Sequence, residues 1–227
     1  AVRADRTVTF SLPKLGQFVG EGAIYSGTVT VQDIGLPGEL IRRMEFGAET
    51  VDGTWVKRAL PPRKPDGHKG TFGKVLILAG SVGFTVAPVL AARAATRTGC
   101  GLVSLAVPNT IYPIVAQKCL EEMPFPLPSD YKSLRNRAAA CDAVLVGPGL
   151  GLSSRAHRLV LGLAEDLEGP LVLDADGINA LSRHMDVLDA RRGCPTILTP
   201  HDGEFARLGG DLSSGDRLGA ARTFAQA

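Results

Sequence analysis

Short apolar segments alternate with segments of helical length between about residue 74 and residue 208. Each apolar segment ends at a glycine, an aspartate or a proline, and a helix-like segment follows it. Strands that are apolar on both faces are typical of a parallel sheet covered by helices, so the pattern predicts an α/β fold. The predicted strands are Val75–Ala79, Leu102–Val107, Ala143–Val146, Leu171–Leu173 and Thr196–Thr199; the predicted helices are Thr85–Thr98, Asn109–Leu120, Ser153–Asp166, one containing Gly177–Leu181, and Gly203–Leu208.

The first 46 residues carry a different pattern. They contain VTF, TVTV and DIGLP with glycine-rich turns, and no apolar repeat of helical length. Isolated short strands are only marginally stable, so we expect residues 1–46 to form a short β-rich piece that cannot bury a face by itself. Residues 47–66 hold a Pro-Pro pair and several charges, which predicts a linker. The segment Ser213–Ala227 begins like a capped helix, because Ser213 lies three residues before Asp216.

Composition and charge narrow the class of protein. The 227 residues include 25 Lys and Arg against 23 Asp and Glu, and this net charge of +2 predicts neither a nucleic acid nor an acidic membrane as partner. Glycines and prolines interrupt the two long uncharged stretches, 75–92 and 98–117, which argues against membrane spans. The four cysteines are widely spaced and form no CxxC pair, which indicates free thiols in a reducing compartment. We therefore expect a soluble, cytoplasmic protein.

Three glycine-rich segments border the predicted strands. HKGTFG precedes the first strand, and its Lys69 could meet a phosphate, although the spacing alone favours a solvated loop. GSVGFT, residues 80–85, leads into a helix whose N-terminus favours an anion. GPGLG, residues 147–151, predicts a rigid turn that is either a wall against a flat ligand or only a tight connection. No single one of these segments identifies a nucleotide-binding fold.

Carboxylate and imidazole side chains follow the last two predicted strands. Asp174 and Asp176 in DADGIN could hold Mg²⁺ through water or act as acid and base, while Asp176 could instead cap the following helix. His201 in TPHDGE could donate hydrogen bonds or carry a proton near neutral pH, and Glu204 could complement the helix dipole. Two further histidines are expected on the surface without functional neighbours: His157 and His184.

Taken together, these motifs resemble the family of ADP-dependent NAD(P)H-hydrate dehydratases. HKGTFGKVLILAGS, GFTxAPVLAARAAxRTGxGLVSLAVP, DAVLVGPGLG, LVLDADGIN and LTPHDGEFARL occur in this order between about His68 and Leu208. The resemblance implies a ribokinase-like three-layer α/β/α fold. It also implies repair of the damaged cofactors NADHX and NADPHX: ADP or ATP, with Mg²⁺, drives dehydration of the S-epimer to NAD(P)H and releases AMP and phosphate. Such chemistry depends on positioning and charge neutralisation.

The resemblance also implies roles for individual residues. The hydrated nicotinamide would be contacted by Ala87, Gly149, Gly151 and His201. Glu204 would organise Mg²⁺ and phosphate, through water, with His201 standing where ribokinase-type folds have asparagine. Together with the motifs above, the candidates for phosphate and Mg²⁺ are Lys69, Asp174, Asp176, Asn179 and Glu204.

Two departures from the family pattern carry expectations of their own. Val86 stands where the family usually has glycine, so we expect it to crowd the ligand or to change the backbone of the turn. The GxGD loop, which supplies the family's anion hole and catalytic aspartate, has no counterpart in residues 209–227. The catalytic residue is therefore left unassigned.

The first 46 residues resemble the last strands of the NAD(P)H-hydrate epimerase domain, an isomerase that precedes the dehydratase in bifunctional repair enzymes. The resemblance rests on VRADRTVTFSLPK followed by GxVxVxDIGLP. We therefore expect a fragment of a longer protein: the end of an epimerase domain at 1–46, a linker at 47–66, and an incomplete dehydratase domain at 67–227 that forms a homo-oligomer. A small-molecule kinase on the same fold and a non-catalytic remnant remain alternatives.

The missing GxGD loop predicts little or no dehydratase activity for the 227-residue chain alone. Each donor of such an anion hole typically contributes about 10²–10³ in rate. When ADP and enzymatically hydrated NADH are added, the near-ultraviolet absorbance of NADH should therefore not recover. Clear recovery catalysed by this chain would show that the expectation is wrong.

Overall fold

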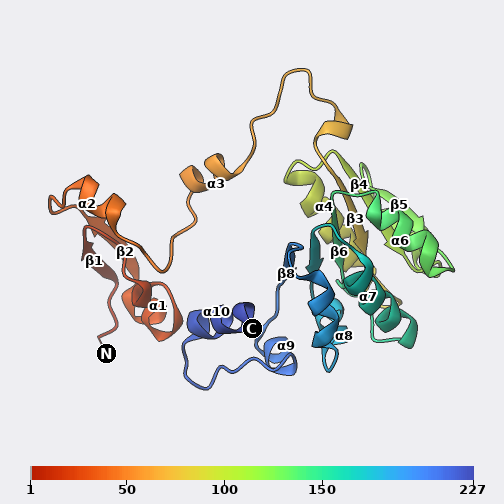
Figure 1. Ribbon diagram of the computed structural model, residues 1–227. Helices are drawn as coiled ribbons and strands as arrows, with labels where there is room; N and C mark the ends of the chain where they lie inside the picture. The colour runs from red at the N-terminus through yellow and green to blue at the C-terminus, as the bar shows by residue number, and fades with distance from the viewer. Residues whose placement is uncertain (1) are drawn as a thin grey trace. The chain divides into compact units, whose positions relative to one another are not determined.

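The computed structural model describes residues 2–227, which separate into two compact units at the boundary between Arg63 and Lys64. The smaller unit contains two parallel strands, β1 (Arg6–Phe10) and β2 (Thr28–Gln32), with Arg6 paired to Thr28. The connection between the strands holds a 3₁₀ helix, η1 (Leu15–Gln17), and helix α1 (Gly20–Ser26). The unit is thus a parallel pair of strands with a helical crossover (Figure 1).

Two further short helices complete the smaller unit, α2 (Gly38–Arg43) and α3 (Gly53–Ala59). Residues 1–46, expected to be β-rich, thus also contain the short helices α1 and α2, and α3 lies inside the stretch predicted as a linker. Helices of six or seven residues are too short to display an apolar repeat, and of these three helices only α3 has a side-chain cap. At α3 the Asp52 carboxylate accepts a hydrogen bond from the Trp55 amide at 2.7 Å.

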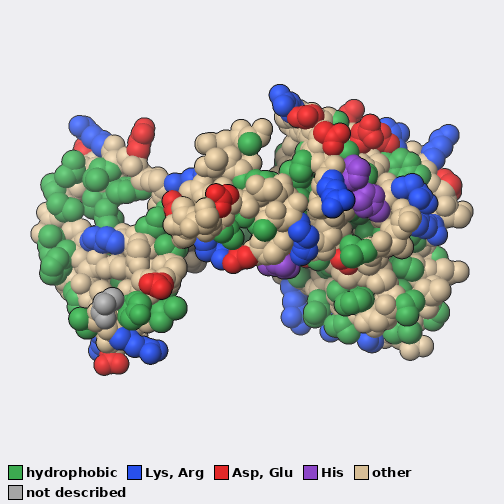
Figure 2. Space-filling model, turned by 90° about the horizontal axis from the view of Figure 1, so that it is seen from below, with side chains coloured by type: hydrophobic (Ala, Val, Ile, Leu, Met, Phe, Trp, Pro, Cys, Tyr) green, Lys and Arg blue, Asp and Glu red, His purple; other side chains and the backbone are tan. Residues whose placement is uncertain are grey.

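The smaller unit buries very little of its apolar surface. Thr9 is the one buried residue among residues 2–63, whereas Val8 and Phe10 on the same strand are exposed. Figure 2 shows hydrophobic side chains over much of the visible face of this unit. Two strands with this much exposed apolar surface lack a core of their own, as the sequence predicts for residues 1–46.

The larger unit is built on a six-stranded sheet in which every strand pair is parallel. The strand order is β5-β4-β3-β6-β7-β8, with β3 near the centre. The five predicted strands are confirmed, and a sixth, β5, was missed because MPFP carries two prolines. Proline is tolerated at the edge of a sheet, where β5 lies. The strands are β3 (Lys74–Leu78), β4 (Leu102–Val107), β5 (Met123–Pro126), β6 (Ala143–Val146), β7 (Leu171–Leu173) and β8 (Thr196–Leu198).

Helices cover both faces of this sheet (Figure 1). Along β3, the side chain of Ile77 enters one apolar cluster with residues of α4 and α5, while Leu76 and Leu78 enter another with residues of α6, α7 and α8. Alternate side chains of one strand therefore reach opposite layers, which confirms the predicted three-layer α/β/α arrangement. The helices are α4 (Val86–Arg97), α5 (Tyr112–Ala116), α6 (Tyr131–Ala139), α7 (Ser154–Asp166), α8 (Asp176–Leu181), α9 (Asp202–Arg207) and α10 (Arg217–Gln226), with 3₁₀ helices η2 (Lys69–Thr71) and η3 (Met185–Arg191).

Helices α10 and α5 differ from the predictions made for residues 213–227 and 109–120. α10 is capped by Asp216, whose carboxylate accepts from the Gly219 amide at 2.9 Å, rather than by Ser213. α5 spans five residues instead of the predicted twelve from Asn109 to Leu120. Within residues 2–227, no helix is both long and apolar enough to cross a membrane.

A buried arginine fastens the loops at the amino edge of β7 and β8. Arg191 is 3% exposed and faces no carboxylate; its Nε donates to Thr196 Oγ1 at 2.8 Å and its Nη2 to the Gly169 carbonyl at 2.6 Å. Nη1 donates to the carbonyl of Leu167. Burial lowers the pKa of the Arg191 guanidinium. The carbonyl oxygens that accept its hydrogen bonds stabilise its positive charge. The α7–β7 loop is thus tied to the start of β8.

Replacing this arginine should cost much more stability than replacing its neighbour. Arg191→Ala removes the side-chain donor from the buried Leu167 carbonyl and from the half-buried bond to the Gly169 carbonyl, so the free energy of unfolding in urea should fall by about 2 kcal/mol or more. Arg192→Ala is the matched control, because Arg192 makes only an exposed ion pair with Asp189 at 2.9 Å and should change stability by less than about 0.5 kcal/mol. Equal losses in the two variants would contradict the assigned role.

Candidate functional site

Four of the predicted motifs lie at one edge of the sheet. β3, β6, β7 and β8 are consecutive neighbours, and all run in the same direction. The segments GSVGFT, GPGLG, DADGIN and TPHDGE each follow one of these strands in that order. Ligands of open α/β sheets bind outside the carboxyl ends of the strands, so this edge is the candidate site.

The Gly149–Gly151 turn presents mainly backbone at this edge. Leu150 in its middle is buried in the apolar core, while Ser81 Oγ donates to the Gly149 carbonyl at 2.8 Å. Gly149 has φ +61°, and a Cβ atom there would lie 2.8 Å from Phe84 Cβ and 3.1 Å from Ala87 Cβ. Any larger residue would collide with α4 and its preceding turn. The structure thus brings Gly149, Gly151 and Ala87 together.

The two carboxylates of DADGIN point to different partners. Asp176 Oδ2 accepts from the Gly151 amide at 2.8 Å, and Asp176 Oδ1 accepts from Asn179 Nδ2 at 3.3 Å. Asp174 Oδ1 accepts from Thr199 Oγ1 at 2.7 Å. The alternative that Asp176 caps α8 is wrong, because the N-cap position belongs to Ala175 and the carboxylate binds an amide from another turn. The two groups therefore do not form a paired acid and base.

A chain of hydrogen bonds continues from Asp176 toward α9. Asn179 Oδ1 accepts from Arg207 Nη1 at 3.0 Å, and α9 carries His201 at its N-cap. Together with the Ser81 bond, these contacts link the turns after β3, β6 and β7 to α9. The residues joined by these bonds are Ser81, Gly149, Gly151, Asp176, Asn179 and Arg207.

Ala175 has a strained backbone between the two aspartates. Its φ of +49° and ψ of −115° lie in a region that residues with a side chain rarely adopt. Such strain persists only where surrounding contacts impose it, and it is common at functional sites. Here the bonds of Asp174 to Thr199 and of Asp176 to Gly151 hold the residues on either side of Ala175 in place.

His201 and Glu204 form a reciprocal cap at the start of α9. His201 Nδ1 accepts from the Gly203 amide at 3.0 Å, while Glu204 Oε2 accepts from the His201 amide at 3.0 Å. Because Nδ1 is an acceptor, the proton of the neutral ring lies on Nε2, which is 3.3 Å from Glu204 Oε1. Glu204 is only 5% exposed, and both its oxygens face His201. Glu204 would therefore reach a Mg²⁺ ion only through water.

The remaining acid of TPHDGE pairs with α10. Asp202 Oδ2 accepts from Arg217 Nη1 at 2.7 Å, and this guanidinium holds the pKa of the Asp202 carboxyl below its usual range. The rings of Phe205 and Phe224 meet edge to face, with centroids 5.0 Å apart, and so attach α10 to α9. Asp202 is thus engaged in a structural contact.

Val86 adopts an ordinary helical backbone as the first residue of α4. It is absent from the residues with positive φ, so the expected change in the backbone does not occur. Its side chain is 52% exposed and stands beside the exposed Phe84 and Leu90. The substitution therefore adds apolar surface at the rim of the site without strain.

Lys69 and the outlying histidines lie elsewhere. Lys69 belongs to η2, which precedes β3 and contacts the segment before β4, so it lies at the amino edge, opposite the other candidates. His157 is half-buried and His184 is exposed, and their rings pack edge to face with centroids 5.2 Å apart. No sequence pattern predicts this pair, because the two residues are brought together only by the fold.

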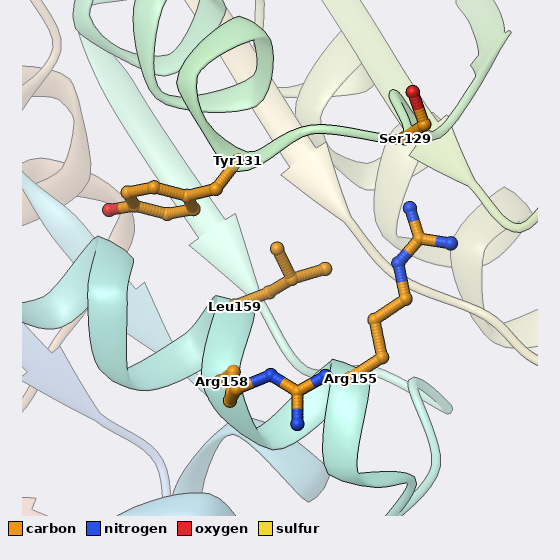
Figure 3. A pocket seen from close by; sticks show the side chains of 5 residues that line it. All are labelled: Ser129, Tyr131, Arg155, Arg158 and Leu159. Carbon is orange, nitrogen blue, oxygen red and sulfur yellow. The ribbon is translucent and has the colours of Figure 1, made fainter.

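A cavity of about 510 Å³ lies between α7 and the loop that precedes α6. Figure 3 shows Arg155 extending from α7 toward the loop that carries Ser129, with Leu159 between Arg155 and Tyr131. Burial and the hydrogen bond to Asp166 raise the pKa of Tyr131 above its usual value, so it stays neutral and donates to that carboxylate. None of the predicted site residues lines this cavity.

The fold and the edge described above define a ribokinase-like α/β protein. The same fold is shown by a ribokinase-like superfamily protein from Enterococcus faecalis, which is 24% identical with a TM-score of 0.59, over 70% of this chain and 58% of that one. The family model of NAD(P)H-hydrate dehydratase matches residues 75–227, which is more than half of the chain. The chain belongs to this family, as the motifs predict.

Relatives and a solved structure agree with this assignment. The bifunctional NAD(P)H-hydrate repair enzyme Nnr of Salinibacter ruber is 42% identical over 241 residues, which cover 100% of this chain and 44% of that protein. The chain thus spans less than half the length of this relative. An ADP/ATP-dependent NAD(P)H-hydrate dehydratase from Bacillus subtilis, co-crystallized with ATP and Mg²⁺, is 27% identical with a TM-score of 0.54, over 75% of this chain and 57% of that one.

The strained backbone of Ala175 predicts that glycine is more stable there. Glycine adopts positive φ without a Cβ penalty, so Ala175→Gly should raise the free energy of unfolding by about 1 kcal/mol. Ala206→Gly is the control, because Ala206 is an exposed residue of α9 and glycine should lower stability there by about 1 kcal/mol. Urea titration measures both, and a loss of stability in both variants would refute the strain.

Proposed function

We propose that this chain supplies the part of an NAD(P)H-hydrate dehydratase that binds the hydrated nicotinamide. The observation that carries the proposal is the Gly149–Gly151 turn, which Ser81 and Asp176 hold in place at the carboxyl edge of the sheet. A turn without protruding side chains lets a flat ring lie directly against the backbone. Family membership makes the damaged nicotinamide ring of NADHX or NADPHX the natural occupant.

The chain's residues would act by positioning the substrate. The ring would rest on Gly149 and Gly151, with Ala87 at its edge and His201 presenting the solvent-exposed side of its imidazole. Holding a substrate in a reactive geometry lowers the entropic part of the barrier, which suits phosphoryl transfer joined to elimination. His201 Nδ1 is occupied by backbone amides, so His201 is assigned a binding role rather than that of a base.

ADP or ATP with Mg²⁺ is the proposed co-substrate. Among residues 2–227, no group of three or more His, Cys, Asp or Glu side chains is placed to hold a metal ion. This fits Mg²⁺, which usually keeps several waters and binds the phosphates of a nucleotide with one or two carboxylates. Glu204 would contact the hydrated ion through water, and the ion would neutralise phosphate charge. Asp174 and Asn179 remain candidates near the same edge.

The smaller unit is proposed to be the end of an epimerase domain. The relatives that match the whole chain are bifunctional repair enzymes, and the exposed apolar residues of β1 and α1 are consistent with a missing cover. On this proposal residues 1–46 belong to the epimerase domain, 47–66 connect the two, and 67–227 belong to the dehydratase domain. Assembly as a homo-oligomer and a cytoplasmic location are also proposals.

The kinase and remnant alternatives are less well supported. The family match and the Bacillus subtilis dehydratase both favour dehydration over phosphorylation of a small molecule. A non-catalytic remnant is not expected to keep Ser81, Asp176 and the glycines in one connected arrangement. The proposed activity is that of a protein as long as the bifunctional relatives, and this chain spans less than half of their length.

The proposed contact between His201 and substrate can be separated from its capping role by two variants of the full-length protein. Asparagine can also accept from helix amides, so only His201→Ala should lower stability, by about 1 kcal/mol in urea. Both His201→Ala and His201→Asn should weaken binding of enzymatically hydrated NADPH, about tenfold by calorimetry, if the ring touches the ligand. Wild-type affinity in His201→Asn would show that His201 serves only as a cap.

A further inference from the structure

We infer that Asp176 is a positioning residue that shapes the Gly149–Gly151 turn, rather than a metal ligand or a proton donor. The inference deepens the proposed function and rests on it for the identity of the ligand. Its structural part stands on contacts between residues that lie 25 positions apart in the sequence. Neither the family match nor the motif spacing assigns this role.

The bond between Asp176 and Gly151 is the contact that carries the inference. Asp176 Oδ2 accepts from the Gly151 amide at 2.8 Å, in a half-buried position. A hydrogen bond from a neutral amide to a carboxylate is about twice as strong as one between neutral groups, and partial burial strengthens it further. The carboxylate thus satisfies an amide that has no other acceptor among the described residues.

The Gly149–Gly151 turn depends on such fixation because of its backbone. Gly149 and Gly151 have φ of +61° and +79°, and glycine chains move freely among such conformations. Ser81 Oγ holds the turn at the Gly149 carbonyl, and Asp176 holds it at the Gly151 amide. Backbone bonds from Gly80 to the Pro148 carbonyl and from Leu150 to the Gly147 carbonyl, each 2.9 Å, hold the first part of the turn. Removing the Asp176 contact therefore frees mainly the Gly151 end.

Asn179 and Arg207 fix the orientation of Asp176 in turn. Arg207 Nη1 donates to Asn179 Oδ1, so the amide nitrogen of Asn179 must face Asp176 Oδ1. Both oxygens of Asp176 are therefore engaged, one by each partner. Each oxygen can accept a further bond, but the bonds present direct both oxygens of Asp176 at protein groups, and this favours a positioning role.

The neighbouring residues support the same conclusion. Asp174 turns toward Thr199, so no second carboxylate stands beside Asp176 to share a proton or a metal ion. Ala175, which lies between Asp174 and Asp176, has a strained backbone conformation. This conformation directs the Asp176 side chain toward the turn after β6. The local sequence therefore tolerates strain in order to make a contact with another loop.

Two substitutions of Asp176 distinguish an acceptor from a charge. Asp176→Asn removes the negative charge but keeps an oxygen that accepts from the Gly151 amide, whereas Asp176→Ala removes the acceptor. Asp176→Asn is made together with Asn179→Asp throughout, so that its amide nitrogen faces an acceptor instead of the Asn179 amide nitrogen. In the 227-residue chain, hydrogen exchange of the Gly151 amide followed by NMR should stay within about threefold of wild type in Asp176→Asn. In Asp176→Ala it should accelerate about tenfold or more. Asp174→Asn is the control and should leave this amide unchanged.

A second experiment uses calorimetry to measure the affinity of the wild-type chain and of the three variants for hydrated NADH. The inference predicts affinity within about threefold of wild type for Asp176→Asn, and a loss of about tenfold for Asp176→Ala. Asp176→Asn losing as much affinity as Asp176→Ala would overturn it, because the charge itself would then be required. A Gly151 amide that stays protected in Asp176→Ala would overturn it as well.

The two arms keep the failure of this inference apart from failure of the proposed function. If wild-type chain does not bind hydrated NADH, the proposed function fails, while the exchange of the Gly151 amide still decides the role of Asp176. If Asp176→Ala does not fold, Asp176→Asn alone remains decisive. It must fold and keep the Gly151 amide protected, and rapid exchange in that variant would overturn the inference.

Discussion

Backbone groups at the carboxyl edge of a parallel sheet have left the strand ladder, and side chains of neighbouring turns must take over as their partners. In this protein Ser81 donates to the Gly149 carbonyl, and Asp176 accepts from the Gly151 amide. These two bonds act with backbone bonds from Gly80 to Pro148 and from Leu150 to Gly147 to hold the turn after β6. Because a free backbone group in a half-buried place is costly, the sequences of the turns after β3 and β7 are coupled to that of the turn after β6.

This constraint explains why so many small residues gather where a ligand is proposed to bind. The close approach of Gly149 to Phe84 and Ala87 leaves no space for a side chain at Gly149. The side chain of Leu150 is buried in the apolar core and anchors the turn there. The turn is therefore fixed before any ligand binds, which reduces the ordering cost of binding. The polar residues that make this possible lie behind the turn, and His201 and Glu204 complete the edge through their own reciprocal cap.

The sequence predicted what depends on local patterns and missed what depends on the fold. Apolar segments ending at glycine, aspartate or proline located five of the six strands, while β5 was hidden by its prolines and the short helices of residues 2–63 by their length. The motifs located the edge of the sheet. Their spacing could not reveal that Asp176 binds Gly151 or that Arg191 is buried among carbonyls. Such contacts join distant residues, and no periodicity records them.

The central claim, that the Gly149–Gly151 turn is the surface that receives the hydrated nicotinamide ring, is tested most directly by amide chemical shifts. Isotope-labelled chain would be titrated with hydrated NADH and, separately, with AMP, which lacks the nicotinamide. The account predicts saturable shifts of the Gly149 and Gly151 amides with hydrated NADH and none with AMP. Saturable shifts confined to other regions of the chain, with these two amides unmoved, would contradict it.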